Sequence, residues 1–295
     1  MVEQALIEKM TRNEADMAFK KRVQTIFEWV NPQDQDLILD LPCGRGFYLN
    51  MLRYVSQARL VGADLDWSVL QKARQVVGDL DDITLMNVNI YEMPYQDASF
   101  DAVILSEVLE HLDDDVRALK EAYRILKPGA VVAVTVPHAN YPFWWDPINK
   151  TREKLGLSPI RKGLLAGLWA NHVRLYQPEA LASALQEAGF IIEEERSFTH
   201  YCFPFIHNLV YGLGKTLLEK GALPDEMASA ADRHNFDSEN GHWWNPINIG
   251  LSLFNLFDKP NKMNEPAGRS TVNLAIKGRK PQDVNSFIFY NEKKK

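Results

Sequence analysis

The ten-residue stretch LILDLPCGRG at residues 37–46 constrains the fold more than any other part of the sequence. An apolar run ends in Asp40 and then breaks into a turn that contains Gly44 and Gly46. This order is typical of a buried parallel strand that leads into a loop beside a cofactor. Because glycine has no Cβ, the two glycines let the backbone approach a bound molecule closely. The stretch therefore predicts an α/β fold with a cofactor loop after its first strand.

The residues after this loop indicate the type of cofactor. A dinucleotide fingerprint needs a third glycine three positions after Gly46, where the helix packs on the strand and the pyrophosphate binds. That position is Leu49, so the loop suits a cofactor with a ribose and an amino-acid tail better than a pyrophosphate. A second expected strand at residues 59–64 ends in Asp64. A carboxylate there suits hydrogen bonds from both hydroxyl groups of a ribose.

Three later segments extend this pattern. They are FDAVILSEVLEHL at 100–112, LKPGA at 126–130 and HVRLYQPE at 172–179. With the glycine turn and Asp64, they resemble the class I S-adenosylmethionine-dependent methyltransferases over roughly residues 20–200. The motifs are most similar to those of small-molecule methyltransferases that modify quinols or lipids. The resemblance implies a doubly wound Rossmann-like sheet, mostly parallel with an antiparallel last strand, and S-adenosyl-L-methionine as the cofactor.

The resemblance also implies a cofactor site at the glycine turn and the ends of the next strands. Its residues are Asp40, Pro42, Gly44, Gly46, Asp64, Leu65, Asn89, Ile90, Leu105 and Ser106. Two of them depart from the family pattern. Pro42 stands where the family usually has glycine, so the turn is stiffer and lacks one backbone donor. Asn89 stands where aspartate is common, and its amide oxygen still accepts a hydrogen bond from the adenine amino group.

The sequence divides into a core and additional segments. Residues 1–30 form an expected helical prefix, and residues 31–200 and 269–280 form the Rossmann-like methyltransferase core. The alternating stretch TVNLAI at 271–276 is the expected last strand. Residues 281–295 are a C-terminal tail. The alternation of strands and helices predicts a doubly wound sheet.

Two insertions, residues 139–170 and 203–268, are not needed by this core. Each follows an expected parallel strand, so both should leave from the carboxyl edge of the sheet, where ligands bind in open α/β folds. Each carries a version of one phrase, FWWDPIN at 143–149 and HWWNPIN at 242–248. The insertions are therefore expected to form helical lids over the site.

The repeated phrase has two interpretations. Asp146 and Asn245 are good N-caps followed by proline, which predicts a helix start. The concentration of aromatic residues predicts an apolar lid that contacts the methyl acceptor. The expected substrate-binding residues are Phe143, Trp144, Trp145, Phe203, Trp243 and Trp244. A satellite core or a dimer surface are the alternatives, whereas few basic residues accompany the apolar helix at 247–257 for membrane contact.

Methyl transfer from a sulfonium is an in-line displacement, so an enzyme mainly aligns the acceptor and removes its proton. Candidate catalytic residues at the expected strand ends are Glu107, His111, His138 and His172. Glu107, Glu110, His111 and His172 also resemble the metal-binding set of polyprenyl-quinol O-methylases and small-RNA 2′-O-methylases. That resemblance implies a divalent ion that orients vicinal oxygens. The alternative is a metal-free site in which the glutamate faces the cofactor and the histidine is packed.

Bulk properties restrict the partners. The net charge is −6, and no Lys/Arg cluster is evident outside Lys293–Lys295, which argues against a nucleic-acid substrate. Two cysteines provide no disulfide framework. No signal peptide and no apolar run long enough to span a bilayer are evident, so we expect a cytoplasmic protein, monomeric or homodimeric.

The sequence therefore predicts an S-adenosylmethionine-dependent methyltransferase acting on a small, hydrophobic acceptor, preferably at oxygen, with carbon and nitrogen as the other candidate acceptor atoms. Two alternatives remain open. One is a metal-assisted O-methyltransferase for quinol or catechol acceptors. The other is an interaction protein that keeps the fold and binds the cofactor without turnover.

Overall fold

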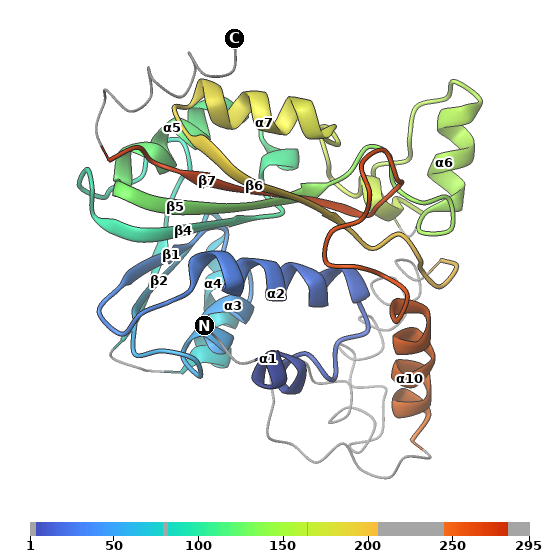
Figure 1. Cartoon of the computed structure of the whole chain (residues 1–295), viewed down its shortest axis with the longest axis horizontal. Coiled ribbons are helices and arrows are strands. Elements are labelled where there is room, and N and C mark those ends of the chain that lie inside the picture. The colour runs from blue at the N-terminus through green and yellow to red at the C-terminus, as the bar shows by residue number, and fades with distance from the viewer. Residues whose placement is uncertain (1–3, 79–81, 164, 206–244, 283–295) are drawn as a thin grey trace.

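The computed structural model describes residues 4–78, 82–163, 165–205 and 245–282, and in these ranges it shows one seven-stranded sheet (Figure 1). The strand order is β3-β2-β1-β4-β5-β7-β6. Strands β1 to β5 run parallel, and β7 runs antiparallel to both β5 and β6. The predicted Rossmann-like sheet with an antiparallel last strand is therefore confirmed.

The central strands are buried on both faces, which explains their continuous apolar runs. The strands are β1 (Leu37–Asp40), β2 (Arg59–Asp64), β3 (Ile83–Asn87), β4 (Phe100–Ser106), β5 (Leu126–Pro137), β6 (Ile191–Phe198) and β7 (Asn273–Arg279). Asp40 pairs with Ile104 of β4, and Ser106 pairs with Thr135 of β5. The register brings the carboxyl ends of β1, β4 and β5 to one edge of the sheet.

Helices cover both faces of the sheet (Figure 1). On one face lie α1 (Gln4–Met10), α2 (Met17–Val30), α3 (Phe47–Leu52) and α4 (Trp67–Val77), and on the other lie α5 (Asp115–Ile125) and α7 (Pro178–Glu187). Helix α2 buries Val23, Ile26 and Phe27, spaced as one helical stripe, against the sheet. The N-terminal prefix therefore contributes to the main core rather than lying outside it.

Both insertions begin at the same edge. Pro137 at the end of β5 and Phe198 at the end of β6 both pair with Asn273. The first insertion contains α6 (Pro147–Lys154) and the 3₁₀ turn η2 (Gly167–Trp169), and the second contains α10 (Pro246–Asp258). Figure 1 places α6 and α10 at the same end of the sheet.

The insertions are joined to the prefix by a third, smaller core. Its members are Met17, Ala18, Tyr141, Trp145, Leu168, Cys202 and Val272. The backbone N–H of Phe205 also donates to the carbonyl oxygen of Trp144 at 3.0 Å, which links the two insertions directly. Within the described ranges, every helix is too short or too polar to traverse a lipid bilayer.

Candidate functional site

The glycine loop after β1 has the backbone geometry that the sequence predicts. Gly44 and Gly46 adopt positive φ angles of +52° and +77°, a region that side chains disfavour. A Cβ on Gly46 would lie 3.1 Å from Cγ1 of Val77, so this glycine is also needed for packing. A Cβ on Gly44 would meet no atom within 4 Å. The loop therefore presents backbone at Gly44 to open space, where a ligand can approach.

Asp64 is held against this loop. Its carboxylate accepts the backbone N–H of Gly44 at 3.1 Å and the backbone N–H of Asp66 at 2.9 Å. Burial raises the pKa of Asp64, and these two hydrogen bonds oppose that rise. The arrangement fixes the carboxylate at the end of β2, beside the loop, which is where the sequence predicts a ribose acceptor.

Asp40 lies deeper and has a different environment. Its side chain is fully buried, and neither carboxyl oxygen has a hydrogen-bond partner among the described residues. Burial, followed by the negative charge of Asp64, raises the pKa of Asp40 well above its ordinary value. Because buried polar groups are normally paired, such a carboxyl group fits a cofactor that brings N–H or O–H donors to it.

The other predicted cofactor residues are divided between core and surface. Ile90 and Leu105 are buried, whereas Leu65 and Asn89 are exposed. The amide oxygen of Asn89 accepts the backbone N–H of Tyr91 at 3.0 Å, so this oxygen is already engaged in a local turn. The contacts of these residues with a cofactor remain predictions.

A chain of polar side chains crosses the carboxyl edge. The Tyr48 hydroxyl lies 3.1 Å from the hydroxyl of Ser106, which lies 2.9 Å from the hydroxyl of Thr135. Thr135 donates to the carboxylate of Glu107 at 3.1 Å. The chain connects the helix after the glycine loop with the end of β4. Tyr48 and Thr135 could not be predicted from the sequence, because each resembles an ordinary helix or strand residue.

Glu107 is the centre of this network. Its backbone has a φ of +55°, which is uncommon for a residue with a side chain and is often found at functional sites. Arg22 of α2 forms an ion pair with its carboxylate at 2.8 Å, and the amide of Asn273 donates to both oxygens at 3.0 and 3.1 Å. Arg22 and Asn273 could not be predicted from the sequence either, since neither belongs to a recognisable motif.

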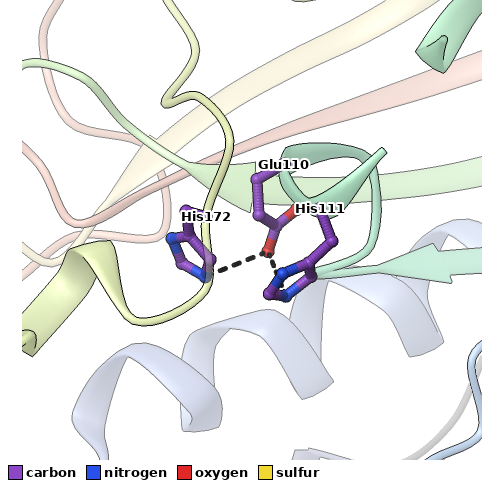
Figure 2. Close-up of side chains that lie close together, drawn as sticks. All are labelled: Glu110, His111 and His172. Carbon is purple, nitrogen blue, oxygen red and sulfur yellow. Dashed lines mark ion pairs between the residues drawn. The ribbon is translucent and has the colours of Figure 1, made fainter. Parts of the chain in front are cut away.

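Three of the four predicted metal ligands come together next to this network. Figure 2 shows Glu110 with Nε2 of His111 and Nε2 of His172, each 3.9 Å from a Glu110 carboxylate oxygen. Glu110 and His111 belong to the 3₁₀ turn η1 (Leu109–His111), and His172 precedes α7. The backbone N–H of Val173 donates to the carbonyl oxygen of Glu110 at 2.8 Å and holds the two segments together. Glu107 is outside this group.

The chemistry of the cluster fits a divalent metal ion. Glu110 is fully buried, and neither of its carboxylate oxygens has a hydrogen-bond partner among the described residues. Burial, followed by the charge of Glu107, raises the pKa of Glu110 well above its ordinary value. Nδ1 of His111 lies 3.1 Å from the carbonyl oxygen of Asn171, which favours a proton on Nδ1 and a lone pair on Nε2. One ligand atom from each residue lies within 4.8 Å of the others.

A model of the methyltransferase domain matches residues 39–134, from β1 into β5. This range includes the glycine loop, Asp64 and the turn with Glu110 and His111. Residues 39–134 are therefore a methyltransferase domain, and the chain is similar to the class I S-adenosylmethionine-dependent methyltransferase family. The family implies S-adenosylmethionine as the cofactor. The carboxyl groups of Asp40 and Asp64 fit it, because the cofactor carries an ammonium group and two ribose hydroxyls as donors.

Curated relatives agree with this family. A probable S-adenosylmethionine-dependent methyltransferase of Mycolicibacterium smegmatis is 28% identical over 163 residues, which is 55% of each chain. An uncharacterized methyltransferase of Schizosaccharomyces pombe is 33% identical over 186 residues, covering 57% of this chain and 66% of that protein. A demethylmenaquinone methyltransferase of Listeria welshimeri is 31% identical over 117 residues, covering 38% and 50%. The chain thus spans about half to two thirds of the length of these relatives.

Solved structures show the same fold at low identity. The [4+2]-cyclase SpnF is 18% identical with a TM-score of 0.52, covering 90% of this chain and 82% of the cyclase. A SAM-dependent methyltransferase from Archaeoglobus fulgidus is 17% identical with a TM-score of 0.51, covering 90% and 95%. Because one of these proteins is named a cyclase, the fold alone does not determine the reaction.

His138 is also a predicted catalytic residue. Its environment differs from those of His111 and His172. It is buried, and its Nδ1 lies 2.7 Å from the hydroxyl of Thr271. Burial is the main reason that its pKa is lowered to about 4. It lines a cavity of about 310 Å³ between β6, β7 and the start of α7, and neither His111 nor His172 lines that cavity. A catalytic role for His138 remains a prediction.

The aromatic residues of the insertions are not equivalent. Trp145 is 2% exposed and packs in the third core, whereas its neighbour Trp144 is 54% exposed. Phe143 contacts Trp144 edge to face, and Phe203 packs in the same way on Phe254 of α10. Trp243 and Trp244 lie outside the described residues. The burial of Trp145 favours the satellite-core interpretation for that residue, and substrate contacts remain predictions for all of them.

Proposed function

We propose that this chain transfers the methyl group of S-adenosylmethionine to an oxygen atom of a small, hydrophobic acceptor. One observation carries the proposal: the Asp64 carboxylate is held by the N–H of Gly44, beside the buried Asp40 carboxyl group, within the matched methyltransferase domain. Both acids and the loop lie at the carboxyl ends of the parallel strands β1 and β2, the usual ligand site of such folds.

The mechanism asks for binding, alignment and removal of one proton. When bound, S-adenosylmethionine supplies a methyl group that an acceptor oxygen attacks in line as the carbon–sulfur bond breaks. Asp64 would bind the ribose hydroxyls, and Asp40 would accept a hydrogen bond from the amino-acid tail. Since Arg22, Thr135 and Asn273 already engage the Glu107 carboxylate, a ring nitrogen of His111 or His172 is better placed to receive the acceptor proton.

Binding and turnover test this proposal separately. We expect calorimetric titration to show binding of S-adenosylmethionine and of its demethylated product. A screen of quinols, phenols and lipid acids should then yield a product heavier by one methylene group in mass spectrometry. Cofactor binding without turnover of any acceptor would support the non-catalytic alternative. Absence of cofactor binding would remove the proposal altogether.

The Glu110–His111–His172 cluster favours a second candidate, a metal-assisted O-methyltransferase for quinol or catechol acceptors. The buried Glu110 carboxylate and the two Nε2 atoms form a donor set that suits a transition metal better than magnesium. A metal ion bound there would polarise vicinal acceptor oxygens and ease loss of the proton. The similarity to a demethylmenaquinone methyltransferase supports a quinol as the acceptor.

Chelation distinguishes the two candidates. If the cluster holds a metal ion, elemental analysis should find about one ion per chain, and Glu110→Gln should lower that content. Activity should fall in chelator and return with manganese or zinc. Full turnover in excess chelator, with no metal in the protein, would leave the metal-free mechanism.

A further inference from the structure

The first insertion carries an unusual charge for this protein. Residues 150–162 contain five basic side chains and one acidic side chain, that of Glu153, although the whole chain has a net charge of −6. Glu153 itself accepts hydrogen bonds from the Tyr141 hydroxyl and from Nε1 of Trp169, both at 2.8 Å. The expectation of no basic cluster outside the tail is therefore wrong, and Lys20, Lys21 and Arg22 are a further basic run. The cations of the insertion are interspersed with leucines along a helix and a loop, so they form no continuous run.

Large apolar side chains are exposed on the same insertion. Leu155 is 69% exposed, and Leu157 and Leu165 are about half exposed. The ammonium group of Lys154 lies 5.3 Å from the ring centre of Phe143, which contacts the exposed Trp144. Cationic and apolar side chains are therefore exposed together on this insertion. We define the insertion surface as Trp144, Lys154, Leu155, Leu157, Arg161 and Lys162.

Internal hydrogen bonds hold the insertion in one conformation. The buried side chain of Asn149 donates to the carbonyl oxygen of Ala166 at 2.9 Å and accepts the N–H of Ile160 at 2.7 Å. The carboxylate of Asp146 accepts the N–H of Leu168 at 3.0 Å. These bonds tie the loop at 158–168 to the start of α6. The insertion surface is thus preformed, and its ordering cost on binding is small.

We propose that the insertion surface docks the protein on an anionic lipid bilayer. A bilayer interface would bind both the cations and the apolar side chains of the surface. Anionic headgroups attract the cations, and the acyl boundary accommodates the leucines and the tryptophan. Nucleic-acid phosphates would attract the cations alone, and the exposed leucines would add nothing to that binding. The occupant that matches the whole surface is therefore a lipid membrane.

The position of the surface gives this docking a consequence for the site. The insertion follows β5 at the carboxyl edge, and α6 lies beyond this end of the sheet (Figure 1). The last turn of the insertion, η2, ends at Trp169, shortly before His172 in the chain. The N–H of His172 donates to the carbonyl oxygen of Trp169 at 3.2 Å. Docking would therefore bring the candidate site close to the membrane. The proposal concerns binding only and does not depend on methyl transfer.

Vesicle sedimentation tests the proposal with the full chain. We expect the protein to sediment with vesicles of phosphatidylcholine and phosphatidylserine and to stay in solution with phosphatidylcholine alone. Binding should weaken as salt is raised, because salt screens the headgroup attraction. The variant Lys154→Gln/Arg161→Gln/Lys162→Gln should lower the partition coefficient roughly 100-fold, since each cation near the surface contributes about fivefold.

Controls separate the insertion surface from general charge. The variant Arg59→Gln/Lys72→Gln/Lys120→Gln removes the same charge from exposed positions elsewhere and should bind vesicles like the unchanged protein. Leu155→Ser/Leu157→Ser keeps all cations and should still lower binding roughly tenfold. Melting temperatures should be unaffected, because all these side chains are exposed.

Three results would overturn the proposal. One is failure to sediment with anionic vesicles. Another is equal loss of binding in the two charge variants. The third is tight binding to duplex RNA or DNA that depends on Lys154, Arg161 and Lys162 but not on the two leucines, which would identify a nucleic-acid surface instead. None of these results bears on cofactor binding or turnover, so the proposed function would stand or fall separately.

Discussion

Two carboxyl groups at the carboxyl edge show how surroundings set the role of a residue. Asp64 accepts two backbone N–H groups and is partly solvated, whereas Asp40 is fully buried with no donor among the described residues. Burial therefore raises the pKa of Asp40 without opposition from hydrogen bonds, whereas hydrogen bonds offset part of the rise that burial causes in the pKa of Asp64. We expect Asp64 to act as an ionised acceptor and Asp40 to depend on the cofactor for its donors.

Replacing Asp64 by alanine should weaken S-adenosylmethionine binding by roughly 1.5–3 kcal/mol, the scale of hydrogen bonds to a charged group. Isothermal titration calorimetry measures this change directly. Asp66→Ala is the matched control, because it removes an exposed side chain that caps α4 through the N–H of Ser68 and keeps the backbone N–H that holds Asp64. It should leave cofactor affinity unchanged. If Asp64→Ala binds S-adenosylmethionine as tightly as the unchanged protein, Asp64 does not belong to the cofactor site.

His138 predicts a pH dependence of stability. Its folded pKa of about 4 lies below the ordinary 6.5, chiefly because of burial, with Lys150 lowering it further and Gln177 and Glu179 opposing the change. As the pH falls, the unfolded chain therefore binds a proton first. The contribution of His138 is fully present above pH 6.5 and is lost as the pH falls toward 4, by about 3 kcal/mol.

Urea denaturation at several pH values checks this prediction. His138→Gln keeps a side-chain partner for Thr271 but cannot be protonated, so its free energy of unfolding should fall less between pH 6.5 and 4. An identical pH slope in the variant and in the unchanged protein would show that other groups cause the acid sensitivity.

Among the elements, α6 and α10 show how one short phrase serves two roles. Asp146 and Asn245 cap these helices through the N–H groups of Asn149 and Ile247, and proline follows each cap. The helix-start interpretation is therefore correct for both phrases. Helix capping accounts for the Asp/Asn-Pro pair. It does not account for the adjacent tryptophans, whose role is either packing or contact with the acceptor.

Trp144 and Trp145 form a natural pair for testing the lid. Trp145→Ala should lower the free energy of unfolding by about 3–5 kcal/mol, because its side chain is buried in the third core. Trp144→Ala should change stability little. If the lid contacts the acceptor, Trp144→Ala should raise KM for the acceptor while cofactor affinity stays constant. Measured melting temperatures and kinetics on both variants decide the matter, and unchanged kinetics in Trp144→Ala would contradict a lid at that residue.

At the scale of the whole molecule, the N-terminal prefix is part of the site. Arg22 on α2 reaches Glu107 at the end of β4, and Asn273 of β7 reaches the same carboxylate from another direction. Arg22 also lies 3.6 Å from Asp16, the N-cap of α2. One ion-pair network therefore joins the first helices, the central sheet and the last strand.

Arg22→Met should destabilise the protein by about 3 kcal/mol, because it leaves two mostly buried carboxylates without their cation. Chemical denaturation measures the change. In a double-mutant cycle, adding Glu107→Gln to Arg22→Met should cost less than the two single changes together. Strict additivity would show that the ion pair contributes nothing to stability.

Local patterns were enough to predict the fold class and the cofactor loop. An apolar run, a carboxylate and two glycines are consecutive in the chain, so strand, turn and backbone approach follow from neighbouring residues. The position of Asp64 is also close to local, since it ends the next apolar run after one crossover helix, and sequential strands usually lie side by side.

The tertiary structure alone decided which side chains meet. The resemblance to metal-dependent methylases groups Glu107 with the metal ligands, yet its carboxylate pairs with Arg22 and with Asn273, which is 166 residues away. Trp144 and Trp145 are adjacent in sequence, and one is exposed while the other is buried. Such outcomes depend on the direction in which each side chain leaves the backbone and on contacts between distant segments. Hydrophobic and glycine patterns determine the elements, whereas packing between elements determines the site.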